Sequence, residues 1–177
     1  MKKKEINIGI LGLGTVGRGT LKILQENKEF IEQKIYPKKI ILKKVADKDK
    51  TKILPDEKFY KIFTDSAEEV INDPEIDIIV ETIGGFEPAK SLIIQALKEG
   101  KHVVTANKEV ITKAGYEILK LAQESKVYFL FEASVASGIP IIGALSHSLT
   151  SYKLKEIIGI LNGTTNYILT KMSEEGK

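Results

Sequence analysis

The stretch GLGTVG at residues 12–17 follows an apolar run over residues 6–11 and precedes a long helical pattern. A strand, a tight glycine turn and a helix N-terminus bring unpaired N–H groups and the positive end of the helix dipole to one point, where an anion can bind. Gly12 permits the sharp turn, Gly14 lets a pyrophosphate approach the backbone, and Gly17 lets helix and strand pack closely. The motif predicts a dinucleotide site, with a glycine-rich turn that binds no ligand as the alternative.

The chain on either side of this turn alternates between strands and helices. Apolar residues after the glycines recur at three- and four-residue steps, which predicts one crossover helix to about Lys34, before Pro37. The predicted strands are residues 6–11, 40–46, 76–83, 102–105 and 127–132; helices are predicted to begin near Ser66 and Pro88 and to cover residues 115–125, and residues 50–60 are predicted to be a polar connection. This alternation predicts the α/β class, with a doubly wound parallel Rossmann-type sheet in a dinucleotide-binding domain over residues 1–132.

The composition narrows the class of protein. The chain has 177 residues, a formal net charge of +3 and no cysteine. Its lysines are spread among acidic residues, which argues against a nucleic-acid surface. The lack of cysteine excludes a disulfide framework, a thiolate metal site and the semialdehyde dehydrogenases that form a thioester. No run approaches the ~18 apolar residues of a membrane span, so we expect a soluble, cytoplasmic protein with no membrane partner.

An acidic residue, Asp47, follows the second predicted strand. A carboxylate at this place can accept hydrogen bonds from the ribose hydroxyls of an adenine dinucleotide. Lys48 and Lys50 lie close to it, and a cation there can pair with a 2′-phosphate, although these lysines also fit a solvated charged turn. Both NAD and NADP are therefore open as the cofactor.

The loops after two later strands carry further candidates. Gly84 follows one strand and Thr105 ends the next, at the carboxyl edge where open α/β sheets bind ligands, so both are candidate cofactor contacts. Asn107 is placed to cap the following helix, and Lys108 then lies near the N-terminus of that helix, where a cation opposes the dipole. A residue that goes against such a local preference at the edge of the sheet where ligands bind is a candidate for a functional role. Lys108 is therefore a candidate for catalysis and cofactor binding, and a surface lysine is the alternative.

The chain changes character after residue 132. Residues 134–140 are a loop of small residues, residues 141–149 are predicted to be a helix and residues 155–161 a strand, and Asn162 lies in a polar turn that starts a last helix. The predicted strand needs neighbours for its backbone hydrogen bonds, and no later strand follows it. We interpret residues 133–177 as the start of a second domain that is apparently truncated.

Five blocks of sequence carry a resemblance to a known family. They read GLGTVG at residues 12–17, VETIGG at 80–85, GKHVVTANK at 100–108, FEASVASGIPII at 131–142 and GILNGTTNY at 159–167. The first block is generic, whereas the last three in this order are close to diagnostic. On these blocks the chain resembles homoserine dehydrogenase along essentially its whole length.

The resemblance implies a reversible, NAD(P)-dependent interconversion of L-homoserine and L-aspartate 4-semialdehyde, on the route to threonine, methionine and isoleucine. Lys108 matches the family lysine that stands between nicotinamide and substrate. Thr15 and Val16 would contact the cofactor, and Gly163 and Thr164 would lie near the substrate.

The resemblance also implies a monovalent cation, typically sodium, held by one acidic residue and nearby backbone carbonyls. Those positions fall on Glu132, Val135, Ser137 and Ile139, and oxygen ligands suit such a hard ion. Ser137 stands where glycine or alanine is more usual.

Family members carry a second catalytic lysine and acidic substrate-binding residues beyond the region that this chain contains, and they dimerise through their second domain. We therefore expect a fragment with weak or no activity of its own, which would form a homodimer in the full-length protein. An NAD(P)-binding module without chemistry is the alternative. A sugar- or imine-reducing oxidoreductase is disfavoured, because such proteins usually have Glu-Lys-Pro where this chain has residues 107–109.

Overall fold

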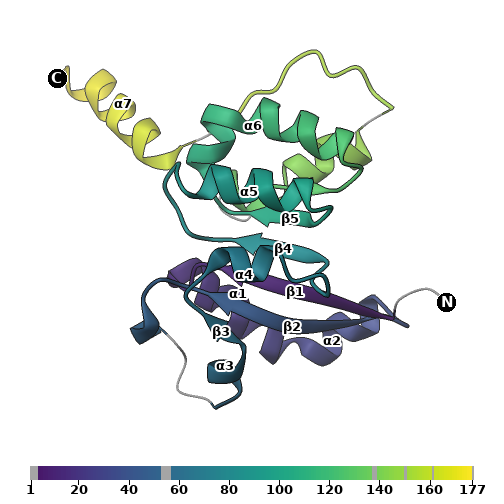
Figure 1. The fold of residues 1–177 in the computed structure, drawn as a ribbon. Coiled ribbons are helices and arrows are strands. Elements are labelled where there is room, and N and C mark those ends of the chain that lie inside the picture. Colours follow the sequence, from purple (N-terminus) through teal and green to yellow (C-terminus); the bar gives the residue numbers. More distant parts are fainter. Residues whose placement is uncertain (1–3, 53–56, 137–138, 150, 161, 177) are drawn as a thin grey trace.

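Six strands form one sheet in the order β3-β2-β1-β4-β5-β6, and every neighbouring pair is parallel (Figure 1). The computed structural model describes residues 4–52, 57–136, 139–149, 151–160 and 162–176. The strands are β1 Glu5–Leu11, β2 Lys39–Ala46, β3 Phe63–Thr64, β4 Ile78–Glu81, β5 His102–Thr105 and β6 Phe129–Leu130. The chain winds outward from β1 in both directions, which confirms the predicted doubly wound Rossmann-type sheet.

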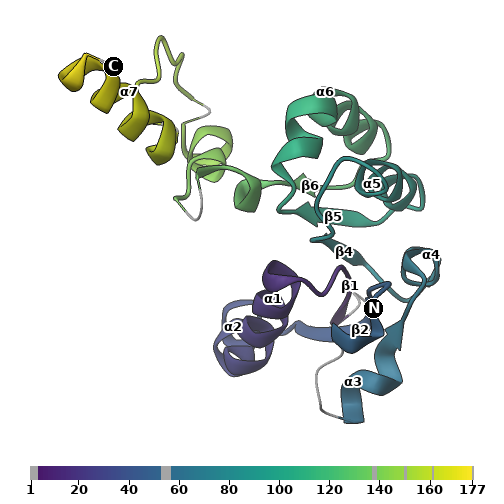
Figure 2. The same ribbon diagram turned by 90° about the vertical axis from the view of Figure 1, so that its left-hand side faces the viewer.

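Helices cover both faces of this sheet. They are α1 Thr15–Glu26, α2 Lys28–Lys34, α3 Glu57–Ile62, α4 Ala67–Ile71, α5 Ala89–Lys98 and α6 Lys108–Glu124. Figure 2 shows α1 and α2 on one side of the strands and α4 and α5 on the other. Each face has its own core: Ile10 packs with Leu21 of α1 in one cluster, and Ile79 packs with Ile93 and Ile118 in the other. Burial on both faces explains why the central strands are apolar runs without alternation.

The helical pattern after the glycine turn forms two helices, so the prediction of a single helix is wrong. Asn27 separates α1 from α2 and has left the helical region, with φ −102° and ψ 17°. Its N–H still donates to the carbonyl of Ile23 at 3.0 Å, and its carbonyl accepts from the N–H of Ile31 at 2.9 Å. The apolar spacing therefore continues across the break, and periodicity alone does not reveal it.

Other boundaries also differ from the predictions. No sequence pattern predicts β3, since two residues carry no periodicity. The stretch predicted to be a polar connection contains a 3₁₀ turn, Lys50–Lys52, and α3. Strands β4 and β6 are shorter than predicted. Helix α6 begins at Lys108, directly after the predicted cap Asn107, and so includes residues ahead of the stretch 115–125 that was predicted to be helical. Ser66 caps α4 as predicted, because its hydroxyl accepts a hydrogen bond from the N–H of Glu69 at 3.2 Å.

The described residues after β6 join no sheet. The strand predicted over residues 155–161 is wrong, because residues 155–160 form no ladder; Leu161 lies outside the described residues. Helix α7, Gly163–Glu175, starts as predicted after Asn162, whose side chain accepts from the N–H of Thr165 at 2.8 Å. Figures 1 and 2 show α7 set apart from the sheet, and every described residue from 151 to 176 is exposed. Among the described residues, none of the helices has the length and apolar character that a membrane span requires.

Candidate functional site

The glycine turn between β1 and α1 approaches the loop after β4. Gly12 has a φ of +94°, in the left-handed region that side chains disfavour, and a Cβ there would lie 2.7 Å from the carbonyl oxygen of Thr82. A Cβ on Gly17 would overlap the carbonyl oxygen of Gly12. The hydroxyl of Thr82 donates to that same carbonyl at 2.8 Å and ties the turn to the loop after β4. The turn and the close packing of α1 therefore both require glycine.

Gly14 differs, because nothing in the fold requires it to lack a side chain. Its φ is −68°, and a Cβ would meet no heavy atom within 4 Å. Gly14 is the N-cap of α1, and no side chain caps the N–H groups of the first turn. Thr15 and Val16 lie in that turn and are exposed. The space in front of Gly14 is open to an anion, which supports the predicted pyrophosphate contact.

Asp47 follows β2 and faces the glycine turn. Its Oδ2 accepts a hydrogen bond from the N–H of Leu13 at 2.7 Å, and its Oδ1 accepts from the N–H of Asp49 at 2.9 Å. The Nζ of Lys52 lies 3.1 Å from Oδ1, and the Asp47 side chain is only 9% exposed. Burial raises the pKa of this carboxyl, but the two N–H groups and Lys52 outweigh burial and hold the pKa below its ordinary value. Asp47 is therefore an anion that joins the end of β2 to the glycine turn.

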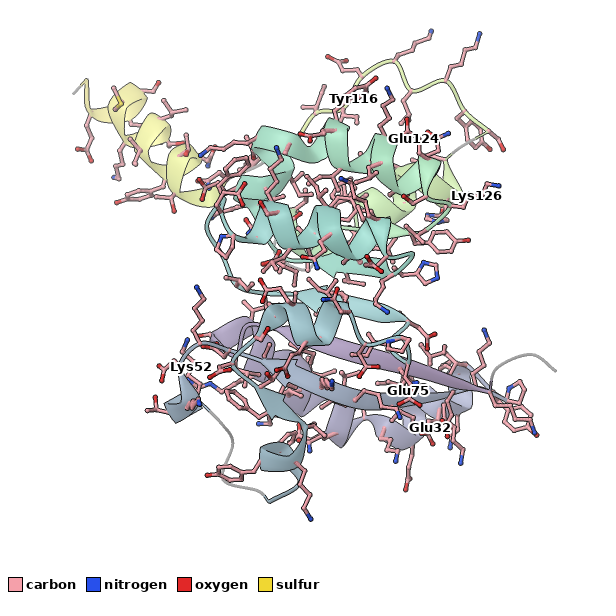
Figure 3. The ribbon with its side chains drawn as sticks, viewed as in Figure 1. Glu32, Lys52, Glu75, Tyr116, Glu124 and Lys126 are labelled. Atoms are coloured by element: carbon pink, nitrogen blue, oxygen red, sulfur yellow. The ribbon has the colours of Figure 1, made fainter. Side chains whose placement is uncertain are left out.

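A cavity of about 280 Å³ lies at this edge of the sheet, beside the point where the strand order reverses between β1 and β4. Its walls include Gly12, Gly14, Asp47, Lys48, Lys52 and Thr82. Lys48 is exposed, and among the described residues it has no ion-pair partner, whereas Lys50 pairs with Asp65 at 3.0 Å. Figure 3 labels Lys52 at the edge where β1 and β2 end. Sequence reasoning missed Lys52, because it lies in a polar stretch without a pattern.

A second group of polar side chains lies where β4 and β5 end. Glu81, the last residue of β4, is fully buried. Its Oε1 accepts from the N–H of Ile83 at 2.8 Å, and its Oε2 accepts from the hydroxyl of Thr105 at 2.5 Å. The Thr105 oxygen also accepts from the N–H of Asn107 at 3.0 Å. Thr105 is 1% exposed, so its hydroxyl supports the sheet edge from inside and does not line the cavity.

Asn107 connects this buried group to the helix that carries Lys108. Its Nδ2 donates to the carbonyl of Gly85 at 2.7 Å, and its Oδ1 accepts from the N–H of Val110 at 3.2 Å, which confirms the predicted helix cap. Lys108 is the first residue of α6 and is exposed. Gly84, next to the contacted carbonyl, is exposed with a φ of +81°. The structure therefore brings Lys108 and the Gly84 loop together through Asn107.

The candidate cation ligands lie just after β6. The carboxylate of Glu132 accepts hydrogen bonds from the N–H groups of Ile141 at 2.7 Å, Ile142 at 2.9 Å and Gly143 at 2.6 Å. The Gly143 bond is the main cause that holds the pKa of Glu132 below its ordinary value. These bonds cap the start of the helical turn that continues as Ala144–Ser148, within the predicted helix. Sequence reasoning did not foresee that Glu132 serves as a cap.

The other candidate cation ligands follow Glu132 in the chain. Val135 and Ile139 lie in the described residues, whereas Ser137 lies outside them. The set contains one anionic carboxylate and backbone carbonyls, which suits a hard monovalent ion by its chemistry. Within the described residues no group of three or more His, Asp or Glu side chains could hold a metal ion.

The substrate candidates Gly163 and Thr164 lie in the first turn of α7 and are exposed. Helix α7 stands apart from the sheet in both ribbon views (Figures 1 and 2), and no hydrogen bond or ion pair among the described residues links Gly163 or Thr164 to Lys108. The described residues thus form a cavity at the glycine turn, and Gly163 and Thr164 do not line it.

The glycine turn, the acid after β2 and the strand order define the class: a dinucleotide-binding domain of Rossmann type. The chain belongs to the homoserine dehydrogenase NAD-binding domain family, whose model matches residues 12–132. A second model, described as homoserine dehydrogenase, matches residues 140–177.

Individual relatives agree with this family. Homoserine dehydrogenase from Synechocystis is 47% identical over 97% of this chain, which covers 39% of that protein. A homoserine dehydrogenase structure from Thiobacillus denitrificans superposes with a TM-score of 0.83 at 44% identity, covering 98% of this chain and 40% of that one. A hyperthermophilic archaeal homoserine dehydrogenase in complex with NADPH gives a TM-score of 0.75 at 30% identity, covering 98% of this chain and 57% of that one. The chain therefore spans about 40% of the length of the first two relatives.

Proposed function

We propose that this chain is the cofactor-binding part of an oxidoreductase that interconverts L-homoserine and L-aspartate 4-semialdehyde. The observation that carries the proposal is the position of Lys108, which begins α6 at the carboxyl edge of the sheet and is linked to the Gly84 loop through Asn107. The relatives named above support the substrate pair. In this proposal residues 1–132 bind the cofactor, and residues 133–177 begin the substrate and dimerisation domain.

The chemistry needs a cation where negative charge develops. When bound, the nicotinamide supplies the hydride for aldehyde reduction or accepts it in the reverse direction. In aldehyde reduction the ammonium group of Lys108 stabilises the developing alkoxide oxygen and delivers a proton to it. In the reverse direction the neutral amine of Lys108 takes up the hydroxyl proton. The N–H groups of Gly14, Thr15 and Val16, which no side chain caps, hold the pyrophosphate, and Asp47 binds the adenosine ribose.

The test replaces Lys108 in the full-length protein that carries this chain. Lys108→Ala should reduce homoserine-dependent formation of reduced nicotinamide by at least a hundredfold, while cofactor affinity stays within about tenfold, or ~1.4 kcal/mol. Lys120→Ala is the matched control, because Lys120 lies on the same helix and makes only a loose exposed contact with Glu124 at 3.9 Å. Near-normal turnover by Lys108→Ala would overturn the assignment.

The choice between NAD and NADP is a second part of the proposal. Lys52 offsets part of the charge of Asp47, and Lys48 lines the same cavity without an ion-pair partner among the described residues. These cations favour a 2′-phosphate over a bare ribose, so we place NADP ahead of NAD. Lys48→Ala should lower NADPH affinity roughly tenfold and leave NADH affinity unchanged. An equal effect on both cofactors, or none, would mean that Lys48 is only a solvated charge.

A monovalent cation, sodium, is proposed near Glu132. The carboxylate oxygens there accept three N–H bonds and still carry a net negative charge, and the carbonyls of Val135 and Ile139 would complete the set together with Ser137. Sodium chloride should raise the unfolding temperature more than choline chloride at equal ionic strength, and Glu132→Gln should abolish the difference. Glu124→Gln, on the exposed end of α6, is the control.

The proposal extends to the setting of the enzyme. A homoserine dehydrogenase would act in threonine, methionine and isoleucine biosynthesis in the cytoplasm, and we propose a homodimer formed by the second domain. The competing proposal is an NAD(P)-binding module that performs no chemistry. Homoserine turnover by a protein that contains this chain would exclude that alternative, whereas cofactor binding without turnover in the full-length protein would favour it.

A further inference from the structure

We propose that Glu81 is a positioning residue for Lys108, which acts through Thr105 and Asn107 without contacting substrate or cofactor itself. This inference rests on the proposed function for its catalytic consequence. Its structural basis is a continuous set of hydrogen bonds that ties the loop after β4 to the turn that begins α6.

The burial of Glu81 is the first step. Its side chain is 0% exposed, and no ion pair with a lysine, arginine or histidine is found among the described residues. Removing a carboxylate from water costs several kcal/mol unless hydrogen bonds replace its hydration. The residue lies in a strand of otherwise apolar side chains, Ile78–Glu81, so an apolar residue would fill the place at less cost. We therefore infer that the carboxylate of Glu81 has a role that an apolar side chain could not fill.

The hydrogen-bond directions explain why this residue is an acid. Both groups that face the Glu81 carboxylate are donors: the N–H of Ile83 and the hydroxyl of Thr105. Because the Thr105 hydrogen points to Glu81, a lone pair of the same oxygen is turned toward the N–H of Asn107. A glutamine at residue 81 offers one acceptor oxygen in place of two. If that oxygen accepts from Ile83, the amide must donate to Thr105, whose own hydrogen then loses its acceptor.

The link then reaches Lys108. The N–H of Asn107 donates to the Thr105 hydroxyl, which orients the backbone at this residue. The side chain of Asn107 donates from Nδ2 to the carbonyl of Gly85 and accepts at Oδ1 from the N–H of Val110, which caps α6. Lys108 follows directly, at a helix N-terminus where its charge is disfavoured by the dipole. Glu81 thus fixes two neighbouring loop ends at once, through Ile83 on its own loop and through Thr105 on the other. In a reaction that depends on geometry, a displacement of about 1 Å can cost about a hundredfold in rate.

The experiment compares Glu81→Gln, Thr105→Val and Thr105→Ser in the full-length protein. Glu81→Gln and Thr105→Val should each lower kcat ten- to hundredfold, with KM for homoserine and the Kd for NADPH changed less than threefold. Thr105→Ser keeps the hydroxyl and should retain kcat within threefold. Because both disruptive changes break one link, the double variant should lose little more than the worse single variant. The positioning role would be overturned if the fold losses in kcat of the two single variants multiplied in the double variant. It would also be overturned if the Kd for NADPH rose by as large a factor as kcat fell.

A second readout does not depend on the reaction. Hydrogen exchange on the same proteins should show faster exchange of the Ile83, Asn107 and Val110 amides in Glu81→Gln, with the amides of β1 unchanged. If the unmodified protein fails to oxidise homoserine while these amides respond, the proposed function fails and the link through Glu81 stands. Unchanged exchange at Asn107 and Val110 would overturn the link itself.

Discussion

The six-stranded region and the segment that follows it are built from similar proportions of apolar residues but differ in what those residues touch. All buried apolar side chains of the described residues lie between Ile8 and Phe129. Beyond residue 150 the large apolar side chains that the structure describes are exposed, with Ile158 at 87% and Ile160 at 72%. Local order is still present there, since Asn162 caps α7 as Asn107 caps α6. Caps and helix propensity therefore form a helix in both regions, but only the sheet region supplies a surface against which apolar groups are buried.

The largest effect is expected in the centre of the sheet region. Ile79 in β4 is 0% exposed and packs in the core with α5 and α6. Ile79→Ala should lower the free energy of unfolding by about 4 kcal/mol, because it removes buried methyl groups and leaves a cavity between packed helices. Urea unfolding of the 177-residue chain followed by circular dichroism measures this loss. A loss below about 1 kcal/mol would mean that this core is not close-packed.

The glycine turn gives the next effect and separates fold from ligand. Gly17→Ala should cost about 3 kcal/mol, because its Cβ would overlap the carbonyl of Gly12, which is backbone and cannot turn aside. Gly14→Ala is the matched control: its Cβ meets nothing within 4 Å, so the free energy of unfolding should change by less than about 1 kcal/mol. Fluorescence titration with NADPH should nevertheless show weaker binding by Gly14→Ala. Equal stability of the two variants would contradict the packing role of Gly17.

The same contrast shows what sequence can predict. The glycines, Asn107 and Asn162 were predictable because a backbone turn or a helix start limits the residues allowed at one position. Contacts between distant segments set the other features. Lys52 pairs with Asp47 because the 3₁₀ turn Lys50–Lys52 reverses the chain after β2. Glu81 accepts a hydrogen bond inside the protein because Thr105 lies opposite it in the neighbouring strand. An acid at the end of an apolar strand was the only signal for Glu81.

The strand prediction for residues 155–161 shows the opposite error. The pattern there has the composition of a strand, but a strand exists only through its neighbours, and the described residues place none beside it. Strand propensity therefore indicates only that these residues can pair in a sheet, and it does not indicate whether a neighbouring strand is present.

A smaller, pH-dependent effect is expected at Asp47. Its pKa is lowered in the folded state, so its contribution to stability is present above the unfolded pKa of about 3.9 and is lost as pH falls through the folded value. Asp47→Asn should cost about 1 kcal/mol at pH 7, because an amide nitrogen would face donors now held by carboxylate oxygens. The difference between the unfolding free energies of the two proteins should therefore shrink steadily as pH falls from 7 to below about 4. A constant difference over this range would mean that the charge of Asp47 plays no part.

The smallest effect tests the exposed segment directly. Ile158→Ala should change the free energy of unfolding of this chain by less than about 0.5 kcal/mol, because the side chain it shortens is 87% exposed. A loss as large as that of Ile79→Ala would show that the segment is packed in solution and would remove the contrast between the two regions. The same substitution in the full-length protein sharpens the comparison. If residues 133–177 begin a second domain that covers this side chain, Ile158→Ala should cost about 2–4 kcal/mol there, since its methyl groups would then be buried. A negligible cost in both proteins would place Ile158 on an outer surface and leave the apolar residues around it to account for any contact with a second domain.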